Sequence, residues 1–252
     1  MGRLLTTCLL TAGACIALSA SAAEIKVLTA GAFKPVAVAV IPEFEKQTGH
    51  KVKLENDTAG ALTTRIAAGE KFDVTILTPS ALDQFAKSGQ VDGASIKRLA
   101  RVAIGVAVKD GAPLPDISSV PAFQKTLLAA RAVAYIDPAA GGSSGIYMSN
   151  QFDKMGIGSQ IRAKAVLVPG GHVADRVVNG EADLGIHQIS EIIAVKGVTL
   201  VGPIPAEMQN YTVYAGALGA HSTEVAAAQA FLRALSSANA LAILKGKGME
   251  AP

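Results

Sequence analysis

The sequence contains an internal repeat, which constrains the fold more than any other feature. The segment 170–190 overlays the segment 57–80 after a shift of 111 positions, and one extra residue then precedes the shared Asp in the earlier copy. Each copy has a glycine, two apolar residues four positions apart, a Gly-Glu turn, an Asp and an apolar run, which is typical of a short helix followed by a buried strand. The matched positions are Gly60 and Gly171, Leu62 and Val173, Arg65 and Arg176, Ile66 and Val177, Gly69 and Gly180, Glu70 and Glu181, and Asp73 and Asp183. Helix, glycine and strand follow one another in many α/β proteins, but so many matches at one offset favour a pair of similar lobes.

Strand and helix patterns alternate along the rest of the chain, which predicts an α/β fold with central, mostly parallel sheets flanked by helices. The two longest helical patterns are 35–47 and 224–244, and Pro42 is expected to kink or break the first of them. Strand-like crossovers near 101–108 and 211–218 would connect the lobes. We therefore expect lobe 1 to comprise 24–104 and 216–252, and lobe 2 to comprise 105–215, with the ligand in the cleft between them.

Residues 1–23 have the pattern of a cleavable secretory signal peptide. Arg3 is followed by an apolar run and then by small residues before Glu24. The run is too short for a retained membrane anchor. Both cysteines, Cys8 and Cys15, lie inside it, and Cys15 is not expected to be acylated because no leucine stands three residues before it. The mature chain is therefore expected in the periplasm, without a disulfide, a thiol nucleophile or a thiolate metal site.

The charge balance argues against a nucleic-acid partner. The formal net charge is +3, and removal of the signal peptide with its single charged residue, Arg3, leaves +2. Such a weak and evenly spread charge does not predict nucleic-acid binding. The signal peptide and the lack of a helix-turn-helix pattern also exclude a DNA-binding regulator.

Four predicted strand-to-helix turns are rich in small residues, and they lie at 30–33, 58–60, 141–145 and 170–172. Small residues let a ligand approach the backbone closely. The first N–H groups of a helix have no internal partner and lie at the positive end of the helix dipole, which favours anions. In open α/β sheets, ligands bind outside the carboxyl ends of strands, where these turns lie. A tight turn alone explains any one of them, but two from each lobe favour a small-anion site.

The side chains at these turns are the candidate ligand-binding residues. His172 and His187 could donate to a carboxylate or carry a proton near neutral pH, although a capping or surface histidine is the alternative. Ser143 and Ser144 could contact an anion or cap a helix, and the sequence lacks the Gly-x-Ser-x-Gly pattern of a nucleophilic serine. No histidines are spaced as metal ligands, so neither a metal nor a cofactor is expected. The full set of predicted ligand-binding residues is Gly31, Ala32, Phe33, Thr58, Ala59, Gly60, Ser143, Ser144, Gly145, Gly171, His172, His187 and Gln188.

Several of these segments together resemble the molybdate-binding-protein-like periplasmic solute-binding proteins. The resemblance is carried by the signal peptide and by the runs 30–35, 59–62, 69–74 and 180–186, and it covers most of the mature chain. It implies a two-lobed type 2 periplasmic-binding-protein fold that closes about a hinge on a small anion. It also implies delivery of that anion to an ABC-type permease in the inner membrane, and we expect the protein to be a monomer.

The chain departs from the family pattern at positions that bear on the ligand. Molybdate binders of this family typically have a serine in each of the first two turns and a tyrosine after the run that here spans 180–186. In those places this chain has Gly31-Ala32-Phe33, Thr58-Ala59 and His187-Gln188. The loss of hydroxyls favours a di- or tricarboxylate, with molybdate or tungstate as an alternative. The family also resembles a periplasmic aconitate isomerase, so the other prediction is a cofactor-free isomerase of cis- and trans-aconitate, in which His172 or His187 moves the proton.

Overall fold

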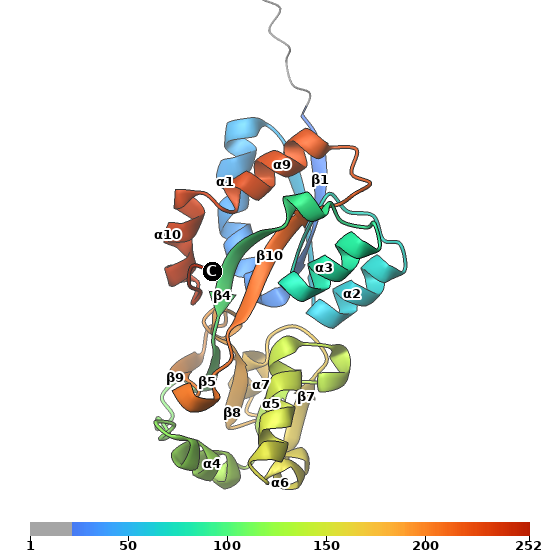
Figure 1. Cartoon of the computed structure of the whole chain (residues 1–252). Helices are drawn as coiled ribbons and strands as arrows, with labels where there is room; N and C mark the ends of the chain where they lie inside the picture. The colour runs from blue at the N-terminus through green and yellow to red at the C-terminus, as the bar shows by residue number, and fades with distance from the viewer. Residues whose placement is uncertain (1–21) are drawn as a thin grey trace, which may run out of the picture.

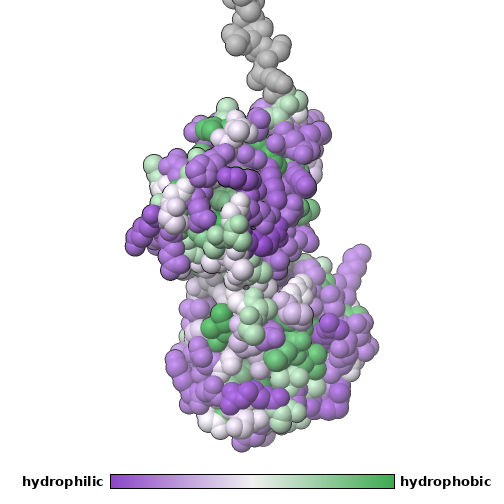
Figure 2. Space-filling model, turned by 90° about the vertical axis from the view of Figure 1, so that its right-hand side faces the viewer, coloured by the Kyte–Doolittle hydropathy of each residue, from purple (hydrophilic) through white to green (hydrophobic). Residues whose placement is uncertain are grey.

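The structure is a computed structural model, and it describes residues 22–252. The predicted signal peptide, with Cys8 and Cys15, lies almost wholly outside the described residues. The described chain forms two five-stranded sheets, each with its own helices. Figure 1 shows these two units one above the other, and Figure 2 shows a narrower waist where they meet. The predicted α/β class, with helices flanking two open sheets, is confirmed.

The first sheet has the strand order β2-β1-β3-β10-β4. Strand β1 runs parallel to β2 and β3, whereas β10 runs antiparallel to both β3 and β4. The strands are β1 (Glu24–Ala30), β2 (Lys51–Asp57), β3 (Val74–Leu77), β4 (Lys97–Val102) and β10 (Thr212–Leu218). The carboxyl ends of its three parallel strands therefore lie at one edge, which faces the second sheet (Figure 1).

The second sheet has the order β7-β6-β8-β5-β9 and the same pattern of directions. Strand β6 runs parallel to β7 and β8, whereas β5 runs antiparallel to β8 and β9. The strands are β5 (Ile104–Lys109), β6 (Val133–Ile136), β7 (Ala165–Val168), β8 (Leu184–Gln188) and β9 (Val198–Pro203). The two copies of the repeat end in β3 and β8, which occupy the central position of their sheets. The repeat thus has a structural basis in two equivalent sheets.

The repeated Asp has the same task in both copies. Asp73 accepts the backbone N–H of Lys26 at 2.7 Å, and Asp183 accepts that of Arg131 at 2.6 Å. Asp73 thus fastens the third residue of β1, and Asp183 fastens the second residue before β6, to the turn that precedes the central strand. A backbone N–H that points past the sheet end needs such a partner, and the Asp satisfies it.

Helices cover both faces of each sheet. Around the first sheet lie η1 (Gly31–Phe33), α1 (Lys34–Thr48), α2 (Ala59–Ala67), α3 (Pro79–Lys87), η2 (Gly93–Ser95), α9 (Val225–Ala234) and α10 (Ala238–Gly246). Around the second lie α4 (Val120–Ala129), η3 (Pro138–Ala140), α5 (Ser143–Lys154), α6 (Gly158–Arg162), α7 (Ala174–Val178), α8 (Ile189–Ile192) and η4 (Ala206–Met208).

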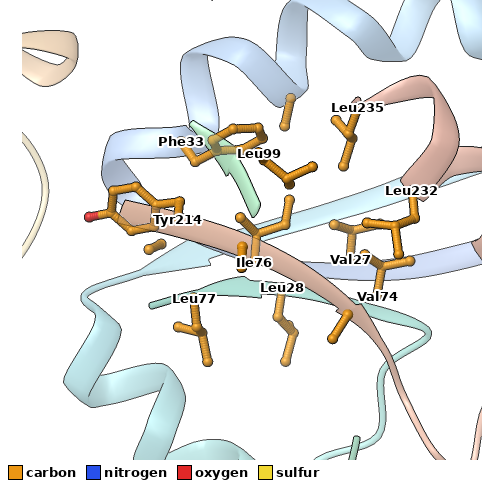
Figure 3. Packing of buried hydrophobic residues seen from close by; sticks show 14 of the residues in the cluster. Val27, Leu28, Phe33, Val74, Ile76, Leu77, Leu99, Tyr214, Leu232 and Leu235 are labelled. Carbon is orange, nitrogen blue, oxygen red and sulfur yellow. The ribbon is translucent and has the colours of Figure 1, made fainter. Parts of the chain in front are cut away.

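Each sheet has its own apolar core. Figure 3 shows part of the first, where Val27 and Ile76 of the sheet lie near Leu232 of α9. The ring of Tyr214 lies at the edge of this cluster, and its hydroxyl points away from the apolar side chains (Figure 3). The second core is built around Tyr135, whose ring packs edge-on against Phe152. A smaller cluster, which includes Ala134, Val168 and Val173, packs separately on the second sheet.

The chain passes between the sheets in the short segments that join β4 to β5 and η4 to β10. Strand β4 ends at Val102, and β5 begins at Ile104 in the other sheet. The return occurs before Thr212, where β10 begins. The sequence-based boundary 104/105 lies one residue inside β5, and 215/216 lies four residues inside β10, because a continuous apolar run does not reveal the residue at which the chain changes sheets.

Two helix predictions need correction. Helix α1 continues through Pro42 to Thr48. Pro42 is solvent-exposed, and the carbonyl that loses its N–H partner belongs to the half-exposed Val38, so water can replace that hydrogen bond. The predicted single helix 224–244 is two helices bent by 54°, because Ser237 caps the start of α10 through the N–H of Ala240.

Within residues 22–252 no single helix is long and apolar enough to cross a membrane, and only α9 and α10 taken together meet that test.

Candidate functional site

A cavity of about 130 Å³ lies between the two sheets, at the carboxyl ends of their parallel strands. It is lined by Ala30 at the end of β1, Asp57 at the end of β2, Ile136 at the end of β6, and Gln188 at the end of β8. The cavity is therefore located where ligands bind in open α/β sheets.

The cavity collects residues from all four predicted turns. Ten of the predicted ligand-binding residues line it, namely Gly31, Ala32, Thr58, Ala59, Ser143, Ser144, Gly171, His172, His187 and Gln188. These positions come from segments up to 157 residues apart in the sequence, and only the fold brings them together. Whether they contact a ligand stays a prediction.

Three predicted residues do not line the cavity. Phe33 is fully buried in the core of the first sheet. Gly60 contacts the backbone of Gly141 across the gap between the sheets. Gly145 backs onto β6, because a Cβ at this position would lie 2.1 Å from the carbonyl oxygen of Ile136. The absence of a Cβ at Gly60 and Gly145 therefore permits close packing of protein on protein at these two positions.

Direct hydrogen bonds join the two units at the rim of the cavity. The N–H of Gly60 donates to the carbonyl of Gly141 at 3.0 Å, and the hydroxyl of Thr58 donates to the carbonyl of Ala140 at 2.5 Å. The same Thr58 oxygen accepts the N–H of Ala61 at 3.1 Å and so caps α2. Since this hydroxyl already donates to Ala140 and caps α2, Thr58 contributes mainly to the contact between the units.

Gln188 organises the polar wall of the cavity. Its amide nitrogen donates to Ser143 at 2.8 Å and to Thr212 at 3.2 Å, and its amide oxygen accepts the hydroxyl of Tyr214 at 3.3 Å. Gln188 is 2% exposed, so this network lies away from bulk water.

Ser143 was expected to cap a helix starting near Gly145. Helix α5 instead begins at Ser143 itself, so its hydroxyl is free to accept from Gln188.

The most unusual feature of the site is a buried pair formed by His187 and Glu191. The Nε2 of His187 lies 3.1 Å from the Oε2 of Glu191, and the two residues are 3% and 8% exposed. Burial, helped by the neighbouring His172, lowers the pKa of His187 to about 3. Burial also raises the pKa of Glu191 to about 8, although the positive charge of Lys34 opposes this shift. Because separated charges are costly away from water, we expect the pair to be mainly uncharged at neutral pH.

Two imidazole nitrogens at this pair lack a hydrogen-bond partner among the described residues. The Nδ1 atoms of His172 and His187 are buried, and neither has a hydrogen-bond partner among the described residues. Buried polar nitrogens without partners are rare in native proteins, and they often mark a place where a ligand supplies the missing bond. Both histidines line the cavity.

The first turn has room for Glu191 because residue 31 is a glycine. A Cβ on Gly31 would lie 2.6 Å from the Oε1 of Glu191, which is closer than a Cβ atom approaches another heavy atom. The serine that molybdate binders resembling this chain typically have in this turn therefore could not lie at position 31 while Glu191 keeps its place. The glycine and the carboxyl group are complementary in shape.

Besides Glu191, the cavity lining contains one basic and one acidic side chain among the described residues. Lys34, at the first position of α1, is its basic residue. Asp57 is held by the N–H of Thr58 at 2.8 Å and lies 3.9 Å from Arg65. No group of three or more His, Cys, Asp or Glu side chains within residues 22–252 is arranged to hold a metal ion. The site can therefore attract an anion through Lys34 and exchange a proton through its buried acid, Glu191.

Sequence analysis missed eight residues that line the cavity, namely Ala30, Lys34, Asn56, Asp57, Ile136, Gly142, Glu191 and Tyr214. Most of them are neighbours of predicted positions. Glu191 had a signal of its own, because it is the only charged residue in the run from Leu184 to Val195 and lies four positions after His187. An isolated acid in an apolar run is rarely buried without a role.

Comparison with known proteins places these features in context. Residues 25–250 match the family of bacterial extracellular solute-binding proteins. A curated relative from Pseudomonas, named aconitate isomerase, is 39% identical over 230 residues, which cover 89% of this chain and 86% of the relative.

Two solved structures share the fold. The periplasmic molybdate-binding protein of Azotobacter vinelandii superposes with a TM-score of 0.76 at 22% identity, covering 91% of this chain and 100% of that one. The sulfate-binding protein of Mycobacterium tuberculosis gives a TM-score of 0.72 at 20% identity, covering 91% and 87%.

Proposed function

Because the chain belongs to the bacterial extracellular solute-binding proteins, we propose that it binds a small di- or tricarboxylate in the cavity between its sheets and isomerises it, with cis- and trans-aconitate as the substrates. The observation that carries this proposal is the buried pair of His187 and Glu191 at the cavity wall. A carboxyl group in a cavity whose pKa is shifted toward neutrality is a candidate for proton transfer, because catalytic acids and bases need a pKa matched to their task.

The reaction requires only the movement of one proton and one double bond. A base removes a proton from the methylene carbon of aconitate, and the electrons of that C–H bond form a new double bond to the central carbon. The electrons of the old double bond take up a proton at the former vinyl carbon. No atom is lost, and no redox partner is needed. A group with a pKa near the working pH performs such transfers best, and Glu191 has a pKa of about 8.

The anionic character of the substrate is supported by other features of the cavity. Lys34 supplies a positive charge, and Ser143 and Ser144 lie at the start of α5. The Nδ1 of His172 and that of His187 can each hydrogen-bond a carboxylate oxygen when they carry the proton. The identity to the relative named aconitate isomerase extends over most of both chains, which also favours this substrate.

The test is to incubate the purified protein, without the predicted signal peptide, with cis-aconitate and to follow formation of the trans isomer by chromatography. We expect catalytic turnover without any added metal or cofactor. Absence of turnover at high protein concentration, with the fold intact, would remove the isomerase proposal for this substrate.

A second candidate is a receptor that captures a di- or tricarboxylate for an ABC-type importer in the inner membrane. It is favoured by the hydrogen bonds from Gly60 to Gly141 and from Thr58 to Ala140, which suit two units closing over a ligand. Calorimetric titration with citrate, aconitate, phosphate and molybdate distinguishes the ligand classes. Tight carboxylate binding without turnover supports the receptor, whereas tight molybdate or tungstate binding with no response to carboxylates contradicts both candidates.

Under either candidate we propose that the protein acts in the periplasm as a monomer after removal of residues 1–23. The pattern of Arg3, the apolar run and the small residues that follow supports export.

A further inference from the structure

We infer that the carboxyl group of Glu191, and not a histidine, is the catalytic residue that takes the proton from the substrate carbon. This inference rests on the proposed isomerase function. It differs from the sequence-based expectation, which assigned the proton transfer to His172 or His187.

The position of the carboxyl group carries the inference. Its Oε2 lies 3.1 Å from the Nε2 of His187, which leaves Oε1 as the oxygen without that contact. Oε1 lies over Gly31, 2.6 Å from where a Cβ of that residue would be. Gly31 and Glu191 both line the cavity, so the oxygen occupies space that a side chain at position 31 would otherwise take. A substrate resting on the first turn would therefore meet Oε1 directly.

The other titratable groups of the cavity are less suitable as the base. Asp57 is held by the N–H of Thr58, lies near Arg65 and is 38% exposed at its side chain, so it is solvated and occupied. Burial and the nearby Glu191 raise the pKa of the Tyr214 hydroxyl, which keeps it un-ionised. Lys34 suits the binding of a carboxylate better than the removal of a proton.

His187 is suited to support the carboxyl group. Its Nε2 is already directed at Glu191, and burial lowers its pKa to about 3, so the imidazole stays neutral over the working range. A neutral imidazole can accept a hydrogen bond from the protonated acid or donate one to the carboxylate, depending on its tautomer. His187 can thus hold the carboxyl group of Glu191 in one place both before and after that group has taken up the proton.

The charged and titratable groups around Glu191 set its titration. They are His187 on β8, Lys34 on α1, Tyr214 on β10, His172 before α7, and Asp57 at the end of β2. Burial raises the pKa of Glu191, and Lys34 lowers it, with the balance at about 8. The base form of Glu191 therefore increases as the pH rises toward 8, whereas a carboxylate with the ordinary pKa of 4.5 is already ionised throughout the range from pH 6 to 8.

The proposed step is balanced. The Glu191 carboxylate accepts a proton from the methylene carbon and becomes the acid. The electrons of the C–H bond form the new double bond to the central carbon, and those of the old double bond move to the former vinyl carbon. Glu191 returns its proton to that carbon, which restores the carboxylate, so protein and ligand end with the number of protons that they had at the start.

The experiment compares Glu191→Gln with His172→Gln and with Glu43→Gln, an exposed control on α1 that is far from the cavity lining. Glutamine preserves the shape of the protonated acid but cannot accept the proton. We expect kcat for aconitate to fall about 10²–10⁴-fold in Glu191→Gln. The Kd for trans-aconitate, measured by calorimetry, should change less than about threefold, and Glu43→Gln should match the parent protein.

The pH profile provides a readout that a structural role would not change. We expect kcat/KM of the parent to rise between pH 6 and 8, and the residual activity of Glu191→Gln to lose this rise. Glu191→Asp, which retains a carboxylate one methylene shorter, should keep part of the activity even if the glutamine variant folds poorly.

The outcomes separate the two proposals. If the parent protein does not turn over aconitate, the proposed function fails. If the parent is active and Glu191→Gln retains its kcat while His172→Gln loses it, the function stands and the assignment to Glu191 is overturned.

Discussion

The contact between Gly60 and Gly141 allows a prediction that can be worked out from the structure. In Gly60→Ala the new Cβ would lie 2.6 Å from the Cα of Gly141. Carbon atoms pack at about 3.5–4.0 Å, so the two backbones must separate by roughly 1 Å. The hydrogen bond from Gly60 to Gly141, now 3.0 Å, then breaks, and the neighbouring bond from Thr58 to Ala140 is weakened.

The magnitude follows from these two bonds. At about 0.5–1.5 kcal/mol each, their loss disfavours the closed arrangement by about 1–3 kcal/mol. Ligand affinity should then fall about 5–150-fold, because about 1.4 kcal/mol corresponds to a factor of ten. The stability of α2 itself should not fall, since alanine is favoured over glycine inside a helix by about 0.5–1 kcal/mol.

Two measurements check this prediction. Calorimetry gives the affinity for aconitate, and small-angle X-ray scattering of the ligand-free protein reports the separation of the two units without reference to any ligand. Gly246→Ala is the matched control, because no atom lies within 4 Å of its new Cβ. The reasoning is refuted if Gly60→Ala binds as tightly as the control and scatters as compactly.

Two further predictions concern stability. Gly145→Ala should destabilise the protein by about 1–3 kcal/mol in urea unfolding, because its Cβ would lie 2.1 Å from the carbonyl oxygen of Ile136; an unchanged unfolding midpoint would contradict this. Hydrogen bonds from Arg65, and then from Lys26, lower the pKa of Glu70 to about 2 from its ordinary 4.5. The folded protein thus gains stability from the ionised Glu70 above pH 4.5 and loses it as the pH falls from 4.5 toward 2. Glu70→Gln should lower stability at pH 7 and have little effect near pH 2, whereas an equal loss at both pH values would show that ionisation is not the cause.

The general location of the site could be predicted because the strand-to-helix turns that form it are recognisable from short stretches of sequence. Small residues at 30–32, 58–59, 142–144 and 171–172 follow strands whose carboxyl ends meet at one edge, and this geometry follows from parallel strand order alone. The repeat also indicated two similar lobes. These inferences depend on short-range patterns that tertiary packing does not alter.

The direction in which each residue of a turn faces could not be predicted in the same way. Gly60 and Gly145 lie in turns that border the cavity, yet each faces protein backbone. Phe33 belongs to the first turn, but its ring enters the core of the first sheet. A one-residue step along a turn or a 3-10 segment changes the facing direction by a large angle, so such choices depend on packing between distant segments.

The buried pair was missed for a related reason. His187 was assessed without Glu191. Glu191 follows it on the four-residue helix α8 and belongs to no recognisable sequence motif. The spacing of four residues was visible, but the proximity of the pair to Gly31 depends on a contact between segments 160 residues apart. Proton-transfer groups are recognised by their environment, and burial is a property of the whole fold.

A crystal structure of the Glu191→Gln variant with bound trans-aconitate would show whether residue 191 faces the reacting carbons. We expect the ligand to lie in the cavity between the sheets, with one carboxylate near Lys34 and its methylene or vinyl carbon about 3–3.5 Å from the side chain of residue 191. A ligand bound elsewhere, or bound in the cavity with its reacting carbons facing away from residue 191, would contradict this expectation.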